Sequence, residues 1–161
     1  MMLRSQQMPA MATNKLTLSV QHADRRLADV LPRPDIRRWV KAAQFAPAEL
    51  VIRFVDDSEG RTLNREYRGK DYATNVLTFA YDDAEQAVDN DIVRADIVLC
   101  VDVLMREAQQ QAIPLAQHAA HLIVHGVLHA QGYDHEADDE AAEMEALEDE
   151  ILVGLGMRTA G

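Results

Sequence analysis

The sequence predicts an α+β fold, a small mixed β-sheet of about four strands that is covered by helices. Segments with strand character are partly interleaved with segments of helical periodicity, and no internal repeat or linker divides them. The chain has 161 residues, the length of one domain, with 48% hydrophobic and 27% charged residues. We therefore predict a single domain over residues 15–157, preceded by a disordered leader over residues 1–14.

Apolar alternation and β-branched residues predict the strands. The first two are expected over residues 15–22 and 49–55. A third, residues 76–81, is expected at an edge of the sheet. The fourth, residues 95–103, is the most apolar and is therefore placed centrally. Cys100 lies inside it and is expected to be buried.

Helices are expected where apolar residues recur at helical spacing, over residues 34–45, 103–112, 114–128 and 138–155. A shorter helix, residues 61–67, follows Ser58, whose hydroxyl is expected to cap its first turn. Its Leu63 and Tyr67 are four residues apart and are expected to face the core. The last helix is expected to place apolar residues on one face and carboxylates on the other.

The most informative stretch is HGVLHAQGYDH, residues 125–135. His125 and His129 are four residues apart, so they lie on the same face of the predicted helix. Gly132 suits a left-handed end of that helix, after which the chain returns and brings in His135. Three imidazoles with an open fourth position are the ligand set of a catalytic zinc ion. The sequence therefore predicts a zincin-like helix and a zinc ion bound by His125, His129 and His135.

Two further residues stay open as parts of this site. His121 lies one turn before His125 and about one turn further from the predicted ion, so it is a candidate neighbour of the ligands, although on spacing alone it could replace His135 as third ligand. Asp134 fits either a base or a carboxylate that orients a ligand imidazole. The spacing is also that of metzincin proteases, in which a glutamate base stands where this chain has Gly126. A metalloprotease is therefore an alternative that lacks its expected base.

Two segments resemble one protein family. HGVLHAQGYDH resembles the H-G-x-L-H-x-x-G-Y-D-H signature of the YbeY family of metal-dependent endoribonucleases. Residues 67–79, YRGKDYATNVLTF, are similar to its Y-R-G-K-D-x-x-T-N-V-L-S-F segment, and the likeness covers residues 15–155. Small departures are Ala130, often Leu in the family, and Tyr72-Ala73, where Lys-Pro is common. The missing lysine removes one positive charge near the expected RNA path.

The resemblance implies a zinc-dependent endoribonuclease specific for single strands. It implies roles in rRNA processing, including 16S rRNA 3′-end maturation, and in ribosome quality control, with His125, His129 and His135 as metal ligands. It places Arg68 beside the metal, where a guanidinium stabilises charge on the scissile phosphate. Lys70, Arg65 and Asn75 are candidate substrate-binding residues, although a solvated helix face for Arg65 and a turn role for Asn75 are open. The implied partners are single-stranded rRNA and the ribosome or its small-subunit proteins, with no DNA.

Net charge is −11, which at first argues against a nucleic-acid partner. Residues 134–150 hold ten carboxylates and no Lys or Arg, so the other 144 residues carry only −1. A basic surface elsewhere is therefore compatible with the composition. The single cysteine suits a reducing cytoplasm, and no run of eighteen apolar residues exists, so no transmembrane helix is expected. A non-catalytic, zinc-containing ribosome-assembly factor, whose acidic last helix binds a basic protein, is the remaining alternative.

Overall fold

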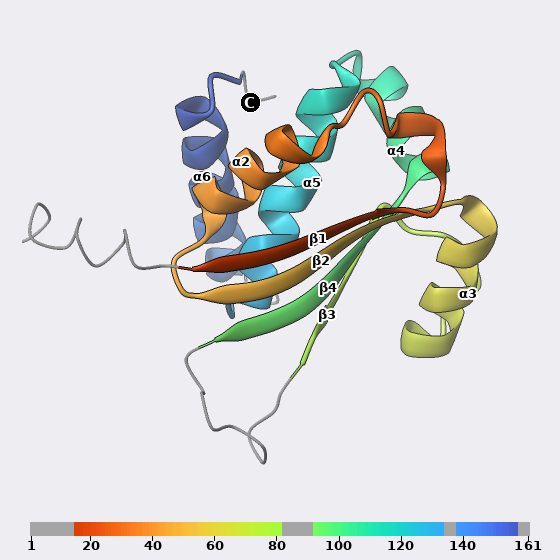
Figure 1. Ribbon diagram of the computed structural model, residues 1–161, viewed down its shortest axis with the longest axis horizontal. Coiled ribbons are helices and arrows are strands. Elements are labelled where there is room, and N and C mark those ends of the chain that lie inside the picture. Colours follow the sequence, from red (N-terminus) through yellow and green to blue (C-terminus); the bar gives the residue numbers. More distant parts are fainter. Residues whose placement is uncertain (1–14, 82–91, 134–137, 158–161) are drawn as a thin grey trace, which may run out of the picture.

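The computed structural model describes residues 15–81, 92–133 and 138–157 (Figure 1). The expected leader, residues 1–14, and the site candidates Asp134 and His135 lie outside these residues. In chain order the elements are β1 (Leu16–His22), η1 (Arg25–Leu27), α2 (Arg33–Ala43), β2 (Ala48–Val55), α3 (Asp57–Arg68), β3 (Val76–Ala80), β4 (Val93–Cys100), α4 (Val101–Gln111), α5 (Leu115–Ala130) and α6 (Asp138–Gly154).

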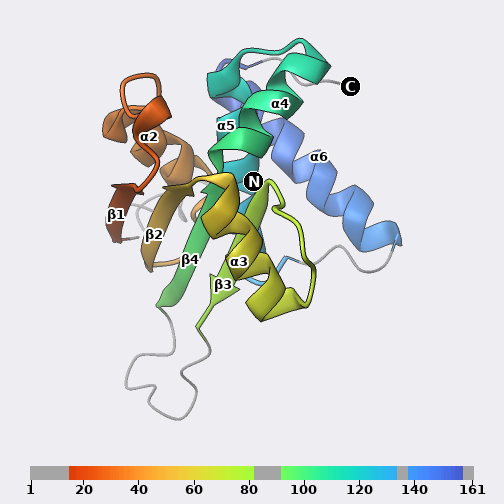
Figure 2. The same cartoon turned by 90° about the vertical axis from the view of Figure 1, so that its right-hand side faces the viewer.

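The four strands form one mixed sheet in the order β1-β2-β4-β3 (Figure 2). β1, β2 and β4 are parallel, and β3 pairs antiparallel with β4. The apolar strand β4 is therefore internal and β3 is an edge, as predicted. Thr78 of β3 lies opposite Ile97 of β4 in this register, and Leu77 lies opposite Val98. Because side chains alternate along a strand, these two pairs face opposite sides of the sheet.

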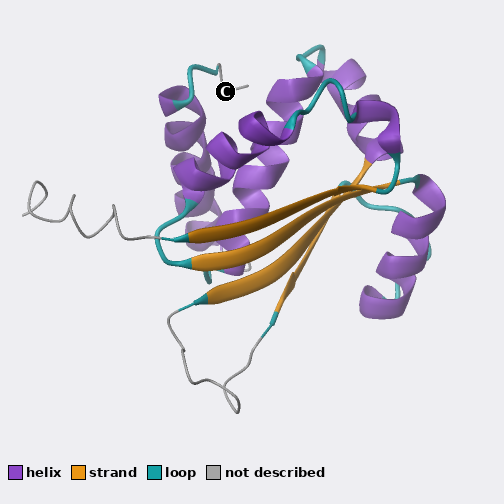
Figure 3. Cartoon of the chain, in the orientation of Figure 1, coloured by secondary structure: helices purple, strands orange, loops and turns teal. Residues whose placement is uncertain are grey.

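One side of the sheet carries the main hydrophobic core. α2, α5 and α6 cover this side, with α5 between the other two and against β3 and β4 (Figures 2 and 3). Trp39 of α2, Ile97 of β4 and Ile123 of α5 are almost completely buried within one cluster. Each buried aliphatic side chain contributes roughly 1.5–3 kcal/mol of hydrophobic free energy. The core therefore fixes α5 firmly on the sheet.

The opposite side of the sheet is covered by α3. Leu63 of this helix packs against a small cluster that consists of Val55, Leu77 and Val98. α3 and α5 thus lie on opposite sides of β3 and β4. None of the described helices is long and apolar enough to cross a bilayer.

α3 begins earlier than predicted, and the expected cap at Ser58 is wrong. Asp56 is the N-cap, and its carboxylate accepts a hydrogen bond from the Glu59 amide at 2.8 Å. The helix ends at Gly69, which adopts a left-handed φ of 71°. Tyr67 does not enter the core as expected, since it is 66% exposed and its ring rests tilted against Phe79.

The boundary between β4 and α4 also differs from the prediction. The strand ends at Cys100, and residues 101–103 form the first turn of α4 rather than the end of the strand. Val101 and Val103 are buried. Because a buried strand and a buried helix are both apolar, the hydrophobic pattern of these residues does not show which of the two they form. Cys100 is a buried free thiol, as predicted, and burial raises its pKa.

Candidate metal centre

α5 approaches the sheet most closely at Gly126. A Cβ atom at this position would lie 2.9 Å from Ile97 Cγ2 and 3.2 Å from Thr78 Oγ1, closer than ordinary contact distances. The helix backbone therefore rests directly on β4 and β3, and no larger side chain fits without displacing it. A glutamate base of the metzincin type would therefore have to displace Ile97 or Thr78 at this position. Glycine at this position of the motif thus suits the close packing of α5 against the sheet.

His125 and His129 lie side by side on α5, as their spacing predicts. Their rings are parallel within 5°, with centroids 6.4 Å apart. His125 is half-buried and His129 is exposed. This pair gives α5 two imidazoles on one accessible face, the donor chemistry that zinc takes from a helix.

The turn after α5 is held in place by Gln131. Its Nε2 donates to the carbonyl of Ala43 at 2.7 Å, and its Oε1 accepts from the amide of Phe45 at 2.7 Å. Gly132 follows with a φ of 102°, which confirms the predicted left-handed end. His135, the expected third ligand, lies outside the described residues together with Asp134, so both assignments stay predictions.

A buried carboxylate on α6 faces the histidines, and the sequence reasoning missed it. Glu148 Oε2 lies 2.6 Å from His125 Nδ1, and Glu148 Oε1 lies 3.0 Å from His121 Nε2. Burial alone would raise the pKa of Glu148, but the hydrogen bonds to His121 and His125 outweigh it and lower this pKa to about 2. The hydrogen bond to Glu148 in turn raises the pKa of His121. The expectation that the carboxylates of this helix all face away from its apolar side is wrong at Glu148.

The signal for this residue was its position in the apolar stripe of α6. Glu148 is four residues after Met144 and four before Leu152, both of which are buried. A carboxylate in such a stripe is unusual, because burial of a charge is costly unless partners satisfy it. Counting the carboxylates of residues 134–150 as one acidic segment treated Glu148 like its exposed neighbours, so its place in the apolar stripe was overlooked.

A second carboxylate connects the site to the start of β3. Glu107 of α4 accepts a hydrogen bond from Asn75 Nδ2 at 3.0 Å and lies 2.8 Å from Nε2 of the buried His118. A cavity of about 510 Å³ lies between β3, α5 and α6, and Asn75, His121, His125 and Glu148 are among the residues that line it. This volume lies in the range of small-molecule binding sites. Asn75 thus lines the same cavity as His121 and His125.

The basic candidates lie on the other side of the sheet. Arg65 and Arg68 belong to α3, and Lys70 follows its C-terminal glycine. Arg65 lies 3.6 Å from Asp71, which also forms an ion pair with Arg61 at 2.8 Å. The histidines belong to α5, which packs against the opposite side of β3 and β4. The proposed roles of the basic residues therefore rest on the family resemblance.

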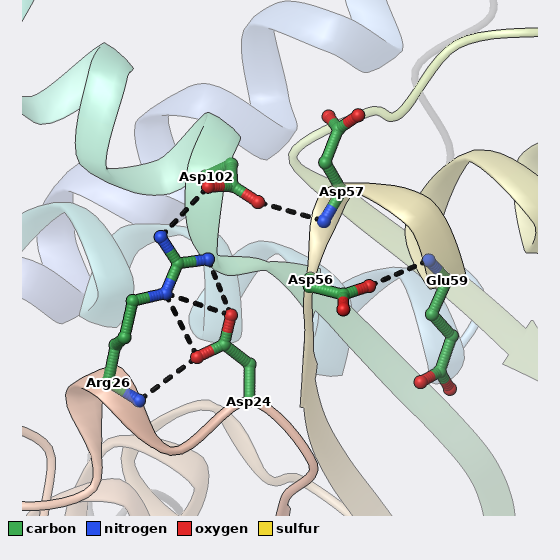
Figure 4. A network of polar contacts seen from close by, with 6 residues as sticks. All are labelled: Asp24, Arg26, Asp56, Asp57, Glu59 and Asp102. Atoms are coloured by element: carbon green, nitrogen blue, oxygen red, sulfur yellow. Dashed lines mark hydrogen bonds and ion pairs between the residues drawn. The ribbon is translucent and has the colours of Figure 1, made fainter.

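A second acidic cluster lies where the parallel strands end (Figure 4). Asp57, Cys100 and Asp102 are the one group of three ligand-type side chains within 4.8 Å of one another among the residues that the structure describes. Arg26 forms an ion pair with Asp102 at 2.9 Å and another with Asp24, and the Asp57 amide donates to Asp102 at 2.8 Å. These contacts already satisfy Asp102, and the raised pKa of Cys100 disfavours the thiolate that binds metals. We assign this cluster to the support of the strand ends.

Comparison with known proteins identifies the family. The family model described as Endoribonuclease YbeY matches residues 13–156. An Endoribonuclease YbeY of Herminiimonas arsenicoxydans is 63% identical over 148 residues, which cover 91% of this chain and 95% of the relative. One of Janthinobacterium sp. (strain Marseille) is 63% identical over 145 residues, covering 90% and 93%. A Thermotoga maritima protein with a known solution structure shares the fold, with a TM-score of 0.52 and 21% identity over 87% of this chain and 92% of that one. The chain belongs to the YbeY endoribonuclease family.

Proposed function

We propose that this protein is a zinc-dependent endoribonuclease that cleaves single-stranded RNA. The observation that carries the proposal is the parallel pair of imidazoles, His125 and His129, which lies on one face of α5 next to the buried carboxylate of Glu148. The names of the relatives in this family give the reaction class. We further propose rRNA processing, including 16S rRNA 3′-end maturation, and ribosome quality control as its cellular roles, with the ribosome or its small-subunit proteins as partners in the cytoplasm.

In this proposal His125, His129 and His135 hold one zinc ion. The donor set fits, because neutral imidazoles are ordinary zinc ligands and the buried carboxylate of Glu148 lies 2.6 Å from Nδ1 of His125. Zinc bound by neutral ligands keeps its double charge, and so supplies Lewis acidity toward a phosphoryl oxygen and activates water.

The remaining tasks fall to Asn75 in the cavity and, through the family resemblance, to the basic residues of and after α3. Asn75 lies on its wall, held by Glu107, and we assign it a contact with the RNA backbone. Arg68 is assigned to the charge that develops on the scissile phosphate, because a guanidinium offers two parallel hydrogen bonds to phosphate oxygens. Lys70 and Arg65 are assigned to the path of the strand. A flexible single strand adapts to such a cavity more easily than a duplex does.

The structure weighs against the metalloprotease. Gly126 occupies the position of the protease base, and a side chain there would have to displace Ile97 and Thr78, since even a Cβ atom would lie 2.9 Å from Ile97 Cγ2 and 3.2 Å from Thr78 Oγ1. Hydrolysis of a peptide by the metzincin route therefore lacks its proton acceptor.

The proposed activity is tested with an end-labelled single-stranded rRNA fragment. Wild type and His129→Ala, purified identically, are compared for cleavage and for zinc content by mass spectrometry. We expect the wild type alone to cleave the RNA and to hold one zinc ion per chain. Equal cleavage by both proteins would contradict the assignment, because a contaminating nuclease or a different site would then account for it.

A further inference from the structure

We propose that Glu148 is a positioning residue of the metal centre: its carboxylate holds His125 through Nδ1, so that the ring presents Nε2 to the metal. The inference rests on the zinc site of the proposed function and assigns a role to a residue of α6 that lies outside the histidine motif.

Each carboxylate oxygen of Glu148 contacts one imidazole ring. Oε2 lies 2.6 Å from His125 Nδ1, and Oε1 lies 3.0 Å from His121 Nε2. An ionised carboxylate only accepts hydrogen bonds, so the ring nitrogens that face it carry the protons. A neutral imidazole has one N–H group, and the proton on His125 Nδ1 leaves the lone pair on Nε2. A metal bound by neutral His125 must therefore use Nε2.

Glu148 is held tightly enough to act in this way. It is 4% exposed, and its neighbours one turn away on the same side of α6, Met144 and Leu152, are buried in the core. A residue that served only to dock α6 at this position would be apolar, because a buried carboxylate is costly unless it is fully satisfied. The burial of Glu148 against two histidines is explained if its charge is needed at the metal centre.

The same contacts give His121 and His125 different roles. Nε2 of His121 faces Oε1 of Glu148, so His121 holds the carboxylate through the oxygen that His125 does not contact. His121 is thereby an anchor for Glu148 rather than a replacement for the third ligand. Carboxylates that hold the second nitrogen of a ligand imidazole also raise its basicity, and their loss typically lowers metal affinity 10–100-fold.

α6 supplies a matched control for the charge. Glu145 also lines the cavity, yet it is exposed and its side chain lies one turn from Glu148. Glu145→Gln and Glu148→Gln remove the same charge from the same helix and the same cavity. Only the second change alters the hydrogen bond to His125.

The test measures zinc affinity of the full-length chain by competition with a chromogenic chelator. We expect Glu148→Gln to bind zinc about 10–100-fold more weakly than the wild type, and Glu145→Gln to bind it like the wild type. Wild-type affinity in Glu148→Gln, or equal losses in both variants, would overturn the proposal. A wild type that binds no zinc would instead contradict the proposed function, so the two failures are distinguishable.

A second measurement uses the wild type alone, so its result does not depend on whether Glu148→Gln folds. Long-range ¹H–¹⁵N spectra of the labelled wild type with zinc report which nitrogen of each imidazole carries the proton and which binds the metal. We expect a protonated Nδ1 and a zinc-bound Nε2 at His125. Zinc on Nδ1 of His125 would overturn the inference.

Discussion

Replacement of Gly126 by alanine should destabilise the protein although alanine is the better helix former. The new Cβ atom would lie 2.9 Å from Ile97 Cγ2, 3.3 Å from Ile97 Cδ1 and 3.2 Å from Thr78 Oγ1. Carbon atoms pack best at about 3.5–4.0 Å, so the 2.9 Å contact is repulsive and the second contact with Ile97 is tight. The contact with Thr78 Oγ1 is also closer than a Cβ atom ordinarily comes to a neighbour. Ile97 is fully buried and β-branched, which leaves it little freedom to move away.

The magnitude follows from two opposing effects. Overpacking of a core costs about 1–3 kcal/mol, and three simultaneous tight contacts place this site in the upper part of that range. The change from glycine to alanine in a helix returns up to about 1 kcal/mol. We expect a net loss of about 1–2 kcal/mol in the free energy of unfolding. For a chain of this size, that loss lowers the melting temperature by about 2–8 °C.

The assay is reversible unfolding in urea and by heat, with Gly154→Ala as the matched control. Gly154 is the last residue of α6, and a Cβ atom there meets nothing within 4 Å. Gly154→Ala should therefore be neutral or slightly stabilising. If Gly126→Ala proved as stable as Gly154→Ala, the close approach of α5 to the sheet would be refuted, and with it the steric argument against a base at this position.

Three further predictions concern other parts of the molecule. Asp56→Ala should cost about 1 kcal/mol, measured by urea unfolding, because the Glu59 amide loses its cap; an unchanged midpoint would contradict the cap. The hydrogen bond to Asp96 raises the pKa of Tyr81 to about 12. This bond therefore stabilises the fold fully below pH 10, and the stabilisation is lost as the pH rises through about 12. Ultraviolet titration should show the Tyr81 pKa returning toward 10 in Asp96→Asn, and no change there would refute the bond. Arg68→Ala should strongly reduce turnover in the cleavage assay while zinc content is retained, and unchanged turnover would remove Arg68 from the catalytic assignment.

The sequence predicted the parts of the fold that local periodicity determines. The mixed sheet of α+β type, the edge position of β3, the internal position of β4 and the histidine-bearing helix were all confirmed. The boundary after Cys100 was wrong because strand and helix are both apolar there, so no change of pattern marks the turn. The cap at Ser58 was wrong because Asp56, an equally good cap, stands two residues earlier.

The candidate site was predictable only where its residues are close in sequence. The pairing of His125 and His129 follows from helical geometry alone. Glu148 lies 23 residues after His125, and only the packing of α6 on α5 brings the two together. The side of the sheet on which α3 lies likewise depends on how Leu63 packs, so the placement of Arg68 did not follow from periodicity.

The most direct test of the account is a zinc titration of the metal-free protein, read out as single-turnover cleavage of a single-stranded rRNA fragment. Chelated wild type should be inactive, and activity should rise with added zinc and saturate at one ion per chain, whereas His125→Ala should stay inactive throughout. Full cleavage by the chelated wild type, or zinc-dependent cleavage by His125→Ala, would contradict a metal centre built on α5.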